Sequence, residues 1–383
     1  MAAVIFALPE IPADQLDVVR RVQELRHKLR YATSEVRIWT RHLLRAELAQ
    51  AVQSSIGIEG YRVTLADAMA VVDGDEPPEA KGEARSANRG YQQAMTYILQ
   101  LADDPHFTYS SDLLRSLHYM MLSYDLDKRP GRWRTGDVYV TQGDRGTVAY
   151  EAPNPDGVPA LMGELIESLN AASDQPVLIR AALAHLNLAM IHPFKDGNGR
   201  MARALHTLVL AREGILAPEF CSIERFLARF PHRYYSVLAE VGQGRWQPHR
   251  DAAPWTRFCL TAHYWQAANL LKNTREQEQI WTALEYLASA EGLPERVLPA
   301  LFDATMHWGL SNATYRHAAE VSDAVATRDL NVLVKKGLLK PVGEKRGRTY
   351  MSARKLTQIE DRFLRPPDHT DPFTGEAIGL SGP

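Results

Sequence analysis

The residues best suited to catalysis or ligand binding lie in one run of twelve, from His192 to Arg203, which reads HPFKDGNGRMAR. The run holds an imidazole, a carboxylate and two guanidinium groups, between helices predicted at 177–190 and 201–213. The imidazole of His192 can accept a proton near neutral pH. The carboxylate of Asp196 is a hard oxygen ligand of the kind that Mg²⁺ prefers. This spacing predicts proton transfer beside a bound metal ion.

The glycines and arginines of the same run suit a phosphate group. Gly197 and Gly199 have no side chain that would keep an anion away from the backbone N–H groups. The helix that follows turns its positive N-terminal end toward the same place. Arg200 and Arg203 are three residues apart, project from one side of that helix and can hold the outer phosphates of a nucleotide. We therefore predict nucleotide binding at this loop.

The same residues also have a plain structural interpretation. Asp-Gly-Asn-Gly can be an ordinary turn, with Arg200 and Arg203 in solvent and His192 at the end of a helix. The complete run decides between the two interpretations, because it resembles, without a mismatch, the signature of the Fic domain family, His-x-Phe-x-(Asp/Glu)-Gly-Asn-Gly-(Arg/Lys)-x-x-Arg. The resemblance extends over roughly residues 41–267.

The resemblance implies a nucleotidyltransferase that moves AMP from ATP to a Ser, Thr or Tyr hydroxyl of a target protein. His192 would deprotonate that hydroxyl, and Asp196 would hold Mg²⁺ between the α- and β-phosphates. The loop backbone would form an anion hole, and the two arginines would bind the β- and γ-phosphates. The nucleotide-binding residues implied in this way are Gly197, Asn198, Gly199, Arg200 and Arg203, with Tyr234 and Tyr235 where relatives line the base. Two tyrosines at a helix start are equally typical of a core, and that alternative stays open.

A predicted β-hairpin interrupts the helices between about 132 and 155. Residues 137–141 and 147–151 favour strands around a turn at 142–146. The hairpin resembles the flap of the Fic family, whose edge aligns an extended segment of the target through main-chain hydrogen bonds. The target-aligning residues would be Thr147, Val148, Ala149 and Tyr150. Without the resemblance, a purely structural hairpin would be the simpler interpretation.

An upstream run, from Ser54 to Gly60, resembles the inhibitory motif of the family, (Ser/Thr)-x-x-x-Glu-(Gly/Asn), in its N-terminal form. Ser55 and Glu59 are four residues apart and share one face if the segment is helical, and Gly60 suits a helix C-cap. A purely structural helix end would look the same. The resemblance implies that Glu59 pairs with Arg203 in place of the γ-phosphate, so that the protein inhibits itself.

The spacing of apolar residues predicts a mainly α fold with one β-hairpin and a C-terminal winged-helix domain, and the resemblance implies that the helices form a Fic-type core with the hairpin as its flap. Helical spacing dominates the first 275 residues, and the pattern changes after Asn273. The predicted units are an N-terminal helical extension at 1–40, a Fic core at 41–275 with its inhibitory helix at about 47–60 and its flap at about 132–155, a winged-helix domain at 276–365 and a flexible tail at 366–383.

The predicted winged-helix domain carries a basic surplus. From Ser311 to Arg365 there are 12 Lys and Arg against 6 Asp and Glu, whereas the whole chain has a formal net charge of -2. Residues 322–333 are typical of a recognition helix capped by Ser322, and a basic loop at 343–348 would be the wing. The DNA-binding residues would be Lys345, Arg346 and Arg348. A docking or dimerisation module with a solvated basic loop is the open alternative.

Composition excludes several classes of protein. Hydrophobic residues make up 45% and charged residues 23% of the 383 residues, which excludes a collagen-like, coiled-coil or wholly disordered chain. Charged residues or histidine interrupt every apolar stretch before about 18 residues, so we expect no membrane-spanning helix. Two cysteines, Cys221 and Cys259, cannot form a disulfide framework and suggest a reducing compartment. We expect a cytoplasmic protein.

Two functions from different classes remain open from the sequence. The first is a self-inhibited protein adenylyltransferase that acts on an unidentified target protein or on itself, with ATP as substrate and Mg²⁺ as cofactor. The second is a DNA-binding transcriptional regulator that uses the Fic core as a nucleotide sensor. The intact His192 and Asp196 favour the enzyme, because a sensor can bind phosphate without a base. The sequence leaves the target, the transferred group and the oligomeric state open, a homodimer included.

Overall fold

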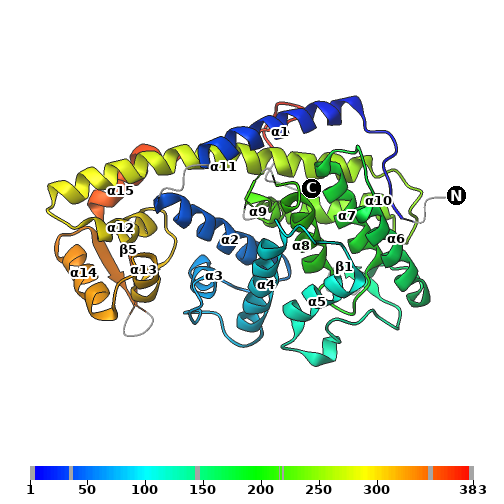
Figure 1. Ribbon diagram of the computed structural model, residues 1–383, viewed down its shortest axis with the longest axis horizontal. Coiled ribbons are helices and arrows are strands. Elements are labelled where there is room, and N and C mark those ends of the chain that lie inside the picture. Colours follow the sequence, from blue (N-terminus) through cyan, green and yellow to red (C-terminus); the bar gives the residue numbers. More distant parts are fainter. Residues whose placement is uncertain are drawn as a thin grey trace.

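The computed structural model describes residues 5–33, 38–142, 147–214, 216–217, 220–343 and 348–378. Over these ranges the fold is mainly helical, with one two-stranded and one three-stranded sheet, which confirms the predicted mainly α class (Figure 1). One long helix, α11 (Ala253–Ala290), runs along one side of the molecule. The remaining elements form a larger group, to the right in Figure 1, and a smaller group, to the left.

Helix α11 connects the two groups without a break. Its 38 residues give it a length of about 57 Å at 1.5 Å per residue. Helix α1 (Ala13–Thr33) packs along it, and the Gln15 side chain donates to the carbonyl oxygen of Ala253 at 2.9 Å. The boundary predicted between residues 275 and 276 lies inside α11, because the change in sequence pattern there does not interrupt the helical periodicity. The two groups therefore share one helix across the predicted boundary.

Helices α7 (Val177–Ile191) and α8 (Asn198–Ala211) form the centre of the larger group. Nearly every residue of both is buried, so each helix is enclosed on all sides. The loop between them has six residues, 192–197, and a buried helix anchors each of its ends. The surrounding helices are α2 (Ile38–Ile58), α3 (Leu65–Val72), α4 (Gly82–Leu101), α5 (Ser111–Leu122), α6 (Val158–Asn170), α9 (Glu224–Arg229) and α10 (Pro231–Gly242).

The predicted hairpin is present in the larger group. It consists of β1 (Tyr139–Gln142) and β2 (Thr147–Glu151), which pair antiparallel. These strands agree with the stretches predicted at 137–141 and 147–151. Most of the predicted turn, residues 143–146, lies outside the described residues.

The smaller group consists of α12 (Leu298–Thr305), β3 (Leu310–Ser311), α13 (Asn312–Ala318), α14 (Asp323–Lys335), β4 (Leu339–Val342), β5 (Thr349–Ser352) and α15 (Arg354–Phe363). Strand β5 lies between β3 and β4 and is antiparallel to both. The Ser322 hydroxyl accepts from the backbone N–H of Val325 at 3.4 Å, which confirms the predicted helix start. Lys345 and Arg346 lie between β4 and β5, outside the described residues.

Residues 366–378, predicted as part of a flexible tail, lie along α11. The Asn269 side chain donates to the carbonyl oxygen of Asp368 at 2.9 Å and accepts from its N–H at 2.7 Å. The Trp265 indole N–H donates to Nδ1 of His369 at 3.1 Å, and Ile378 is buried. Side chains of α11 hold the segment through its backbone and through the His369 imidazole, contacts that need no apolar periodicity in the segment itself.

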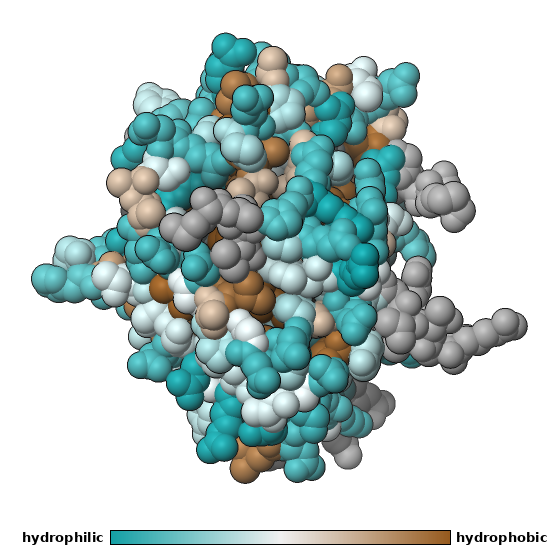
Figure 2. All heavy atoms as spheres, turned by 90° about the vertical axis from the view of Figure 1, so that its right-hand side faces the viewer, coloured by the Kyte–Doolittle hydropathy of each residue, from teal (hydrophilic) through white to brown (hydrophobic). Residues whose placement is uncertain are grey.

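The surface at one end of the molecule, the right-hand end of Figure 1, is mainly hydrophilic (Figure 2). Hydrophobic side chains occur there in small groups between hydrophilic ones. Such groups are usual on protein surfaces and do not by themselves mark a docking site. Among the described residues, no helix has both the length and the apolar character needed to span a membrane.

Candidate functional site

His192 ends helix α7 in a left-handed conformation, with φ 52° and ψ 57°, which turns the chain out of the helix. Its Nδ1 lies 3.2 Å from the carbonyl oxygen of Ala189. A carbonyl oxygen only accepts, so this contact assigns the proton to Nδ1 and leaves a lone pair on Nε2. Burial lowers the pKa of His192 to about 4, and the charge of Arg134 adds to the effect. The imidazole is therefore neutral at pH 7, with Nε2 able to accept a proton.

Arg134 holds the backbone around His192, a contribution that the sequence did not reveal. Its Nε donates to the carbonyl oxygen of His192 at 2.8 Å, and its backbone N–H donates to that of Pro193, also at 2.8 Å. The same guanidinium donates to the carbonyl oxygens of Gly136 and Pro153, on either side of the hairpin. One side chain therefore fixes the hairpin and the loop relative to each other.

His118 is a second residue that the sequence did not reveal. Its ring stacks on Phe194, with centroids 3.7 Å apart and an interplanar angle of 3°. The N–H of Gly131 donates to its Nδ1 at 2.8 Å, so Nε2 carries the proton and donates to the carbonyl oxygen of Asp196 at 2.9 Å. Burial lowers the pKa of His118 to about 4, which keeps the ring neutral. This imidazole links the loop to the segment that leads into the hairpin.

The loop closes on itself before helix α8 begins. The Asn198 side chain accepts from the N–H of Phe194 at 2.9 Å and donates to its carbonyl oxygen at 3.0 Å. Gly197 caps α8 with φ 76°, and a Cβ at this position would lie 2.6 Å from the side chain of Leu122. The loop therefore requires glycine at 197 for both conformation and space. Because the Asn198 side chain bonds to the loop backbone, an anion here would contact the backbone N–H groups and the two arginines.

Asp196 projects from this loop with 37% of its side chain exposed. Its Oδ1 accepts from the N–H of Gly197 at 2.6 Å, and its Oδ2 lies 3.1 Å from the Lys128 ammonium. Burial alone would raise the pKa of Asp196, but Lys128 and Arg200 outweigh it and hold the pKa below its usual value. The group is therefore an ionised carboxylate at neutral pH.

The donor set around Asp196 fits a divalent cation that also contacts phosphate. Among the described residues, no three His, Cys, Asp or Glu side chains are arranged to hold a metal ion by themselves. A single carboxylate is nevertheless what Mg²⁺ commonly takes from a protein when phosphate oxygens supply further ligands. The Lys128 ammonium already lies against this carboxylate, which shows that the position accepts positive charge.

Arg203 is enclosed by the predicted inhibitory segment. Its Nε donates to the Ser55 hydroxyl at 2.8 Å, and its Nη2 donates to the Ser55 carbonyl oxygen at 3.1 Å and to Oε1 of Glu59 at 2.7 Å. The Arg203 side chain is 1% exposed and that of Glu59 23%. A Cβ at Gly199 would lie 2.7 Å from the same Glu59 oxygen. The Glu59 carboxylate therefore lies on the backbone at the start of α8, in contact with Arg203.

The inhibitory segment begins on α2 and ends in the turn predicted from its sequence. Helix α2 ends at Ile58, and Gly60 follows with φ 86°, as a glycine after a helix C-terminus often does. Tyr61 then donates its hydroxyl to Oε1 of Glu83 at 2.6 Å. Glu59 is thus held from both sides, by α2 before it and by the Tyr61 contact after it.

Arg200 is buried as well, with 1% of its side chain exposed. Its Nη2 lies 3.8 Å from Asp196, and its Nη1 reaches the Tyr124 hydroxyl at 3.5 Å. Its Nε has no hydrogen-bond partner in the described part of the chain. The alternative in which both arginines are solvated is therefore wrong. An incompletely satisfied guanidinium beside the turn is suited to an anion.

The two tyrosines predicted near the base take different positions. Tyr234 is 2% exposed, and its hydroxyl lies 3.0 Å from Nε2 of His185 in the core. Tyr235 is 50% exposed, and its hydroxyl reaches the carbonyl oxygen of Ile58, next to Glu59, at 3.5 Å. Of the pair, only Tyr235 offers surface to a ligand in this conformation.

Of the four predicted flap residues, only Tyr150 has a described side chain. It is 8% exposed and donates its hydroxyl to the carbonyl oxygen of Met190 at 2.9 Å. Tyr150 therefore anchors β2 to Met190 near the end of α7, two residues before His192. Thr147, Val148 and Ala149 are described by their backbone alone: Thr147 and Val148 pair with β1, and Ala149 lies at an irregularity in the register.

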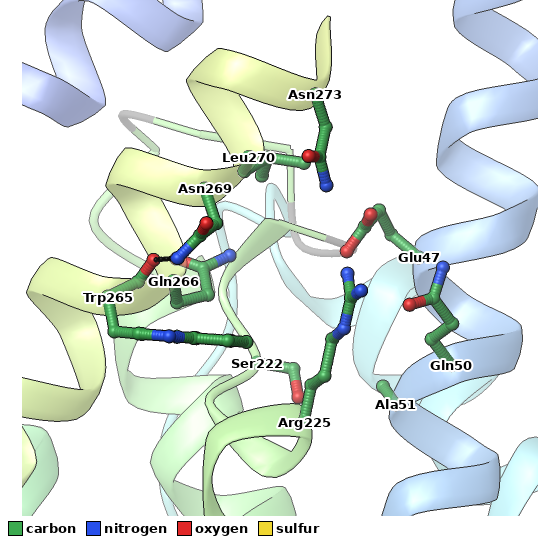
Figure 3. Close-up of a pocket in the computed structure, with 10 residues that line it drawn as sticks. All are labelled: Glu47, Gln50, Ala51, Ser222, Arg225, Trp265, Gln266, Asn269, Leu270 and Asn273. Atoms are coloured by element: carbon green, nitrogen blue, oxygen red, sulfur yellow. Dashed lines mark hydrogen bonds between the residues drawn. The ribbon is translucent and has the colours of Figure 1, made fainter. Parts of the chain in front are cut away.

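A separate pocket lies between α2, α9 and α11 (Figure 3). Arg225 of α9 extends into it between Glu47 of α2 and Trp265 of α11. Burial raises the pKa of Glu47, and the Arg225 charge opposes this effect. No residue of 192–203 lines the pocket, so it is distinct from the site around His192.

The comparisons with known proteins agree with this geometry. Residues 108–210 match the model of the Fic/DOC family. These residues form a Fic domain. The match contains α5, the hairpin, α6, α7 and nearly all of α8, and so every residue of the run from His192 to Arg203.

Relatives extend the similarity beyond the Fic domain. The chain is 30% identical over 253 residues to "Protein adenylyltransferase Fic" of Culex quinquefasciatus, which covers 63% of this chain and 47% of the relative. It is 27% identical over 255 residues to "Protein adenylyltransferase fic-1" of Caenorhabditis elegans, which covers 65% of this chain and 46% of the relative. The chain thus spans about half the length of these curated relatives.

Solved structures share the fold. A Fic family protein from Desulfovibrio desulfuricans G20 matches with a TM-score of 0.55 and 21% identity, over 90% of this chain and 97% of that one. Residues 134–508 of Fic-1 from C. elegans match with a TM-score of 0.54 and 22% identity, over 68% of this chain and 73% of that one. At these identities the likeness supports the fold alone.

Proposed function

We propose that this chain is a self-inhibited protein adenylyltransferase, a nucleotidyltransferase that moves AMP from ATP to a Ser, Thr or Tyr hydroxyl of a target protein or of itself. The names of its relatives support this activity. The observation that carries the proposal is the His192 imidazole, which is neutral, oriented through Nδ1 and adjacent to a turn suited to phosphate. A nucleotide sensor would need the turn but not this base.

In the proposed reaction, Nε2 of His192 takes the proton of the target hydroxyl. The oxygen attacks the α-phosphorus in line, the bond from that phosphorus to the bridging oxygen of the β-phosphate breaks, and pyrophosphate leaves. Arg134 and His118 keep the base and the loop in place through backbone contacts. Proximity and orientation supply much of the rate enhancement in such transfers.

The phosphates would bind at the start of α8. The backbone of Gly197, Asn198 and Gly199 would form the anion hole, and Arg200 and Arg203 would hold the β- and γ-phosphates. Asp196 would hold Mg²⁺, which when bound supplies positive charge that offsets the charge of the phosphates. Tyr235 would line the base, and the edge of β2 from Thr147 to Tyr150 would align the target segment.

The direct test of the proposal is radiolabel transfer. The protein is incubated with Mg²⁺ and ATP labelled at either the α- or the γ-phosphate, alone and with lysate. We expect protein-bound label from the α-labelled ATP only, because pyrophosphate carries the γ-phosphate away. Label from the γ-position would indicate phosphate transfer, and no label from either, even with the Glu59→Gly variant, would contradict the proposed activity.

We also propose that residues 276–365 contain a winged helix that binds DNA in the cytoplasm. The order of α12, β3, α13, α14, β4 and β5, with β5 at the centre of the sheet, supports the winged-helix interpretation. Thr327, Arg328 and Asn331 are exposed on α14, where a recognition helix would present base-reading side chains. The buried thiols of Cys221 and Cys259 support a reducing compartment.

DNA binding by this region should weaken steeply with salt, because each phosphate that the protein neutralises releases counterions. The triple variant Lys345→Ala, Arg346→Ala and Arg348→Ala should bind more weakly. Its negative slope of log K against log salt should become shallower by about 3. Fluorescence anisotropy with a labelled duplex measures both quantities. Binding that salt does not affect, or no binding at low salt, would favour the docking module.

A further inference from the structure

Lys128, the last residue of the 3₁₀ helix η1 (Leu126–Lys128), lies among three carboxylates. Its Nζ is 2.6 Å from Oε1 of Glu83, 3.1 Å from Oδ2 of Asp196 and 3.7 Å from Oδ2 of Asp125. We call these four residues the Lys128 cluster. They come from three separate parts of the chain, the first turn of α4, the approach to η1 and the loop before α8.

The Lys128 cluster has more negative than positive charge. One ammonium faces three carboxylates, and Arg200, whose Nη2 lies 3.8 Å from Oδ1 of Asp196, offsets only one of the two remaining charges. The Lys128 side chain is 21% exposed, so water screens these contacts less than it would on an open surface. The Lys128 ammonium therefore offsets part of the negative charge around Asp196.

Lys128 can give up Asp196 and remain bound. Its shortest contact is with Glu83, and that carboxylate is fixed in turn by the Tyr61 hydroxyl at 2.6 Å. When a divalent ion approaches Asp196, the ammonium can keep Glu83 as its partner and move away from the ion. Only Gly60 separates Tyr61 from Glu59, so the same carboxylate contacts the residue that follows the inhibitory segment.

We propose that Lys128 is a positioning residue that holds Asp196 in place with its own charge and competes with the divalent cation for that carboxylate. The proposal rests on the proposed function only in taking Asp196 as the metal ligand. It implies that a divalent cation binds Asp196 more weakly while the Lys128 ammonium lies beside that carboxylate, and that Lys128 offsets the Asp196 charge when no metal is bound.

The test measures binding of Mn²⁺ alone, without nucleotide, from the electron paramagnetic resonance signal of the free ion. We expect Lys128→Met to bind Mn²⁺ at least tenfold more tightly than the parent, because the competing charge is gone while all three carboxylates remain. Lys128→Arg keeps the charge and should bind as the parent does. Adding Asp196→Asn to Lys128→Met should remove the gain.

Lys195→Met is the matched control for loss of one positive charge. Lys195 is exposed, lies next to Asp196 in sequence and donates to the backbone carbonyl of Asp127, not to a carboxylate. Thermal melts establish that each variant is folded. Unchanged Mn²⁺ affinity in folded Lys128→Met, an equal gain in Lys195→Met, or a gain that survives Asp196→Asn would each overturn the proposal. None of these outcomes depends on AMP transfer, which the label experiment tests by itself.

Discussion

Replacement of His192 by alanine is expected to lower the rate of AMP transfer by about 10² to 10⁴, the usual cost of losing a general base. ATP affinity should change little, because Nε2 of His192 acts on the target hydroxyl and the phosphates bind at the start of α8. Initial rates with α-labelled ATP measure the first quantity, and calorimetry with a non-hydrolysable ATP analogue measures the second. His106→Ala is the control, because it removes an exposed imidazole outside the run from His192 to Arg203, and it should transfer AMP as the parent does.

The backbone at 192 calls for a second variant. With φ 52°, alanine is strained at this position, whereas asparagine tolerates the left-handed region better. His192→Asn should therefore keep the stability of the parent and still lose the transfer rate. If folded His192→Asn transfers AMP as fast as the parent, the imidazole is not the base.

A pH titration gives an independent measure of the protonation state of the His192 imidazole. A base acts only when it is neutral, and burial lowers the pKa of His192 to about 4. The fraction of neutral imidazole therefore stays high as the pH falls through 6.5 and drops only near pH 4. We expect an NMR titration of the free protein to place the midpoint of the His192 ring near 4, well below the ordinary value for histidine of about 6.5.

Local contacts explain why so much of the site could be predicted from the sequence. Asn198 bonds to Phe194 four residues away, Gly197 caps the helix that starts at the next residue, and His192 ends the preceding helix. These features depend on residue types at fixed short spacing. The Glu59 contact with Arg203 spans 144 residues, and only the resemblance of both segments to one family indicated it.

Other parts of the site depend on contacts that leave no pattern in a single sequence. His118 bonds to the backbone of Gly131 and Asp196, and Arg134 bonds to carbonyl oxygens only. A backbone partner can belong to any residue type, so nothing in the sequence marks it. Lys128 has side-chain partners, but Glu83 lies 45 residues away and only the fold brings the two together.

The domain boundary predicted between residues 275 and 276 coincides with no break in the helix. A change in composition after Asn273 indicated a new unit, yet α11 continues through it to Ala290. Helical periodicity reports which face of a helix is buried, not what covers that face. The covering elements change along α11 from those of the larger group to those of the smaller group, and the helix itself is continuous.

Replacement of Glu59 by glycine is expected to raise the rate of auto-modification at least tenfold. With Glu59 present, Nη2 of Arg203 already has a carboxylate partner at 2.7 Å, and the same oxygen lies against Gly199. A γ-phosphate would meet a filled and negatively charged position, so ATP would bind poorly or with its α-phosphate misaligned. Loss of about 1.4 kcal/mol of this competition corresponds to a tenfold gain in productive occupancy.

Ser55 explains why removal of Glu59 should activate the enzyme without disordering its arginine. The Arg203 guanidinium keeps two contacts to Ser55, one to the hydroxyl at 2.8 Å and one to the carbonyl oxygen at 3.1 Å. A Cβ at Gly199 would lie 3.1 Å from Nη1 of this guanidinium, so the side chain held by Ser55 still faces the turn where the γ-phosphate would bind. Ser55→Ala should therefore reduce the activation seen in Glu59→Gly, since it releases the Nε end of the same guanidinium.

The melting temperature provides a second measure of the competition between Glu59 and the γ-phosphate for Arg203. Glu59→Gly leaves a buried guanidinium without its carboxylate, which destabilises the folded state. ATP can replace that partner, so it should raise the melting temperature of the variant more than that of the parent at equal concentration. The double variant Glu59→Gly with Arg203→Ala should lose both the activation and the extra stabilisation by ATP, because the γ-phosphate then has no freed guanidinium to bind. If folded Glu59→Gly modifies itself no faster than the parent, or if the double variant stays activated, the Glu59 contact with Arg203 is a structural ion pair and does not inhibit the enzyme.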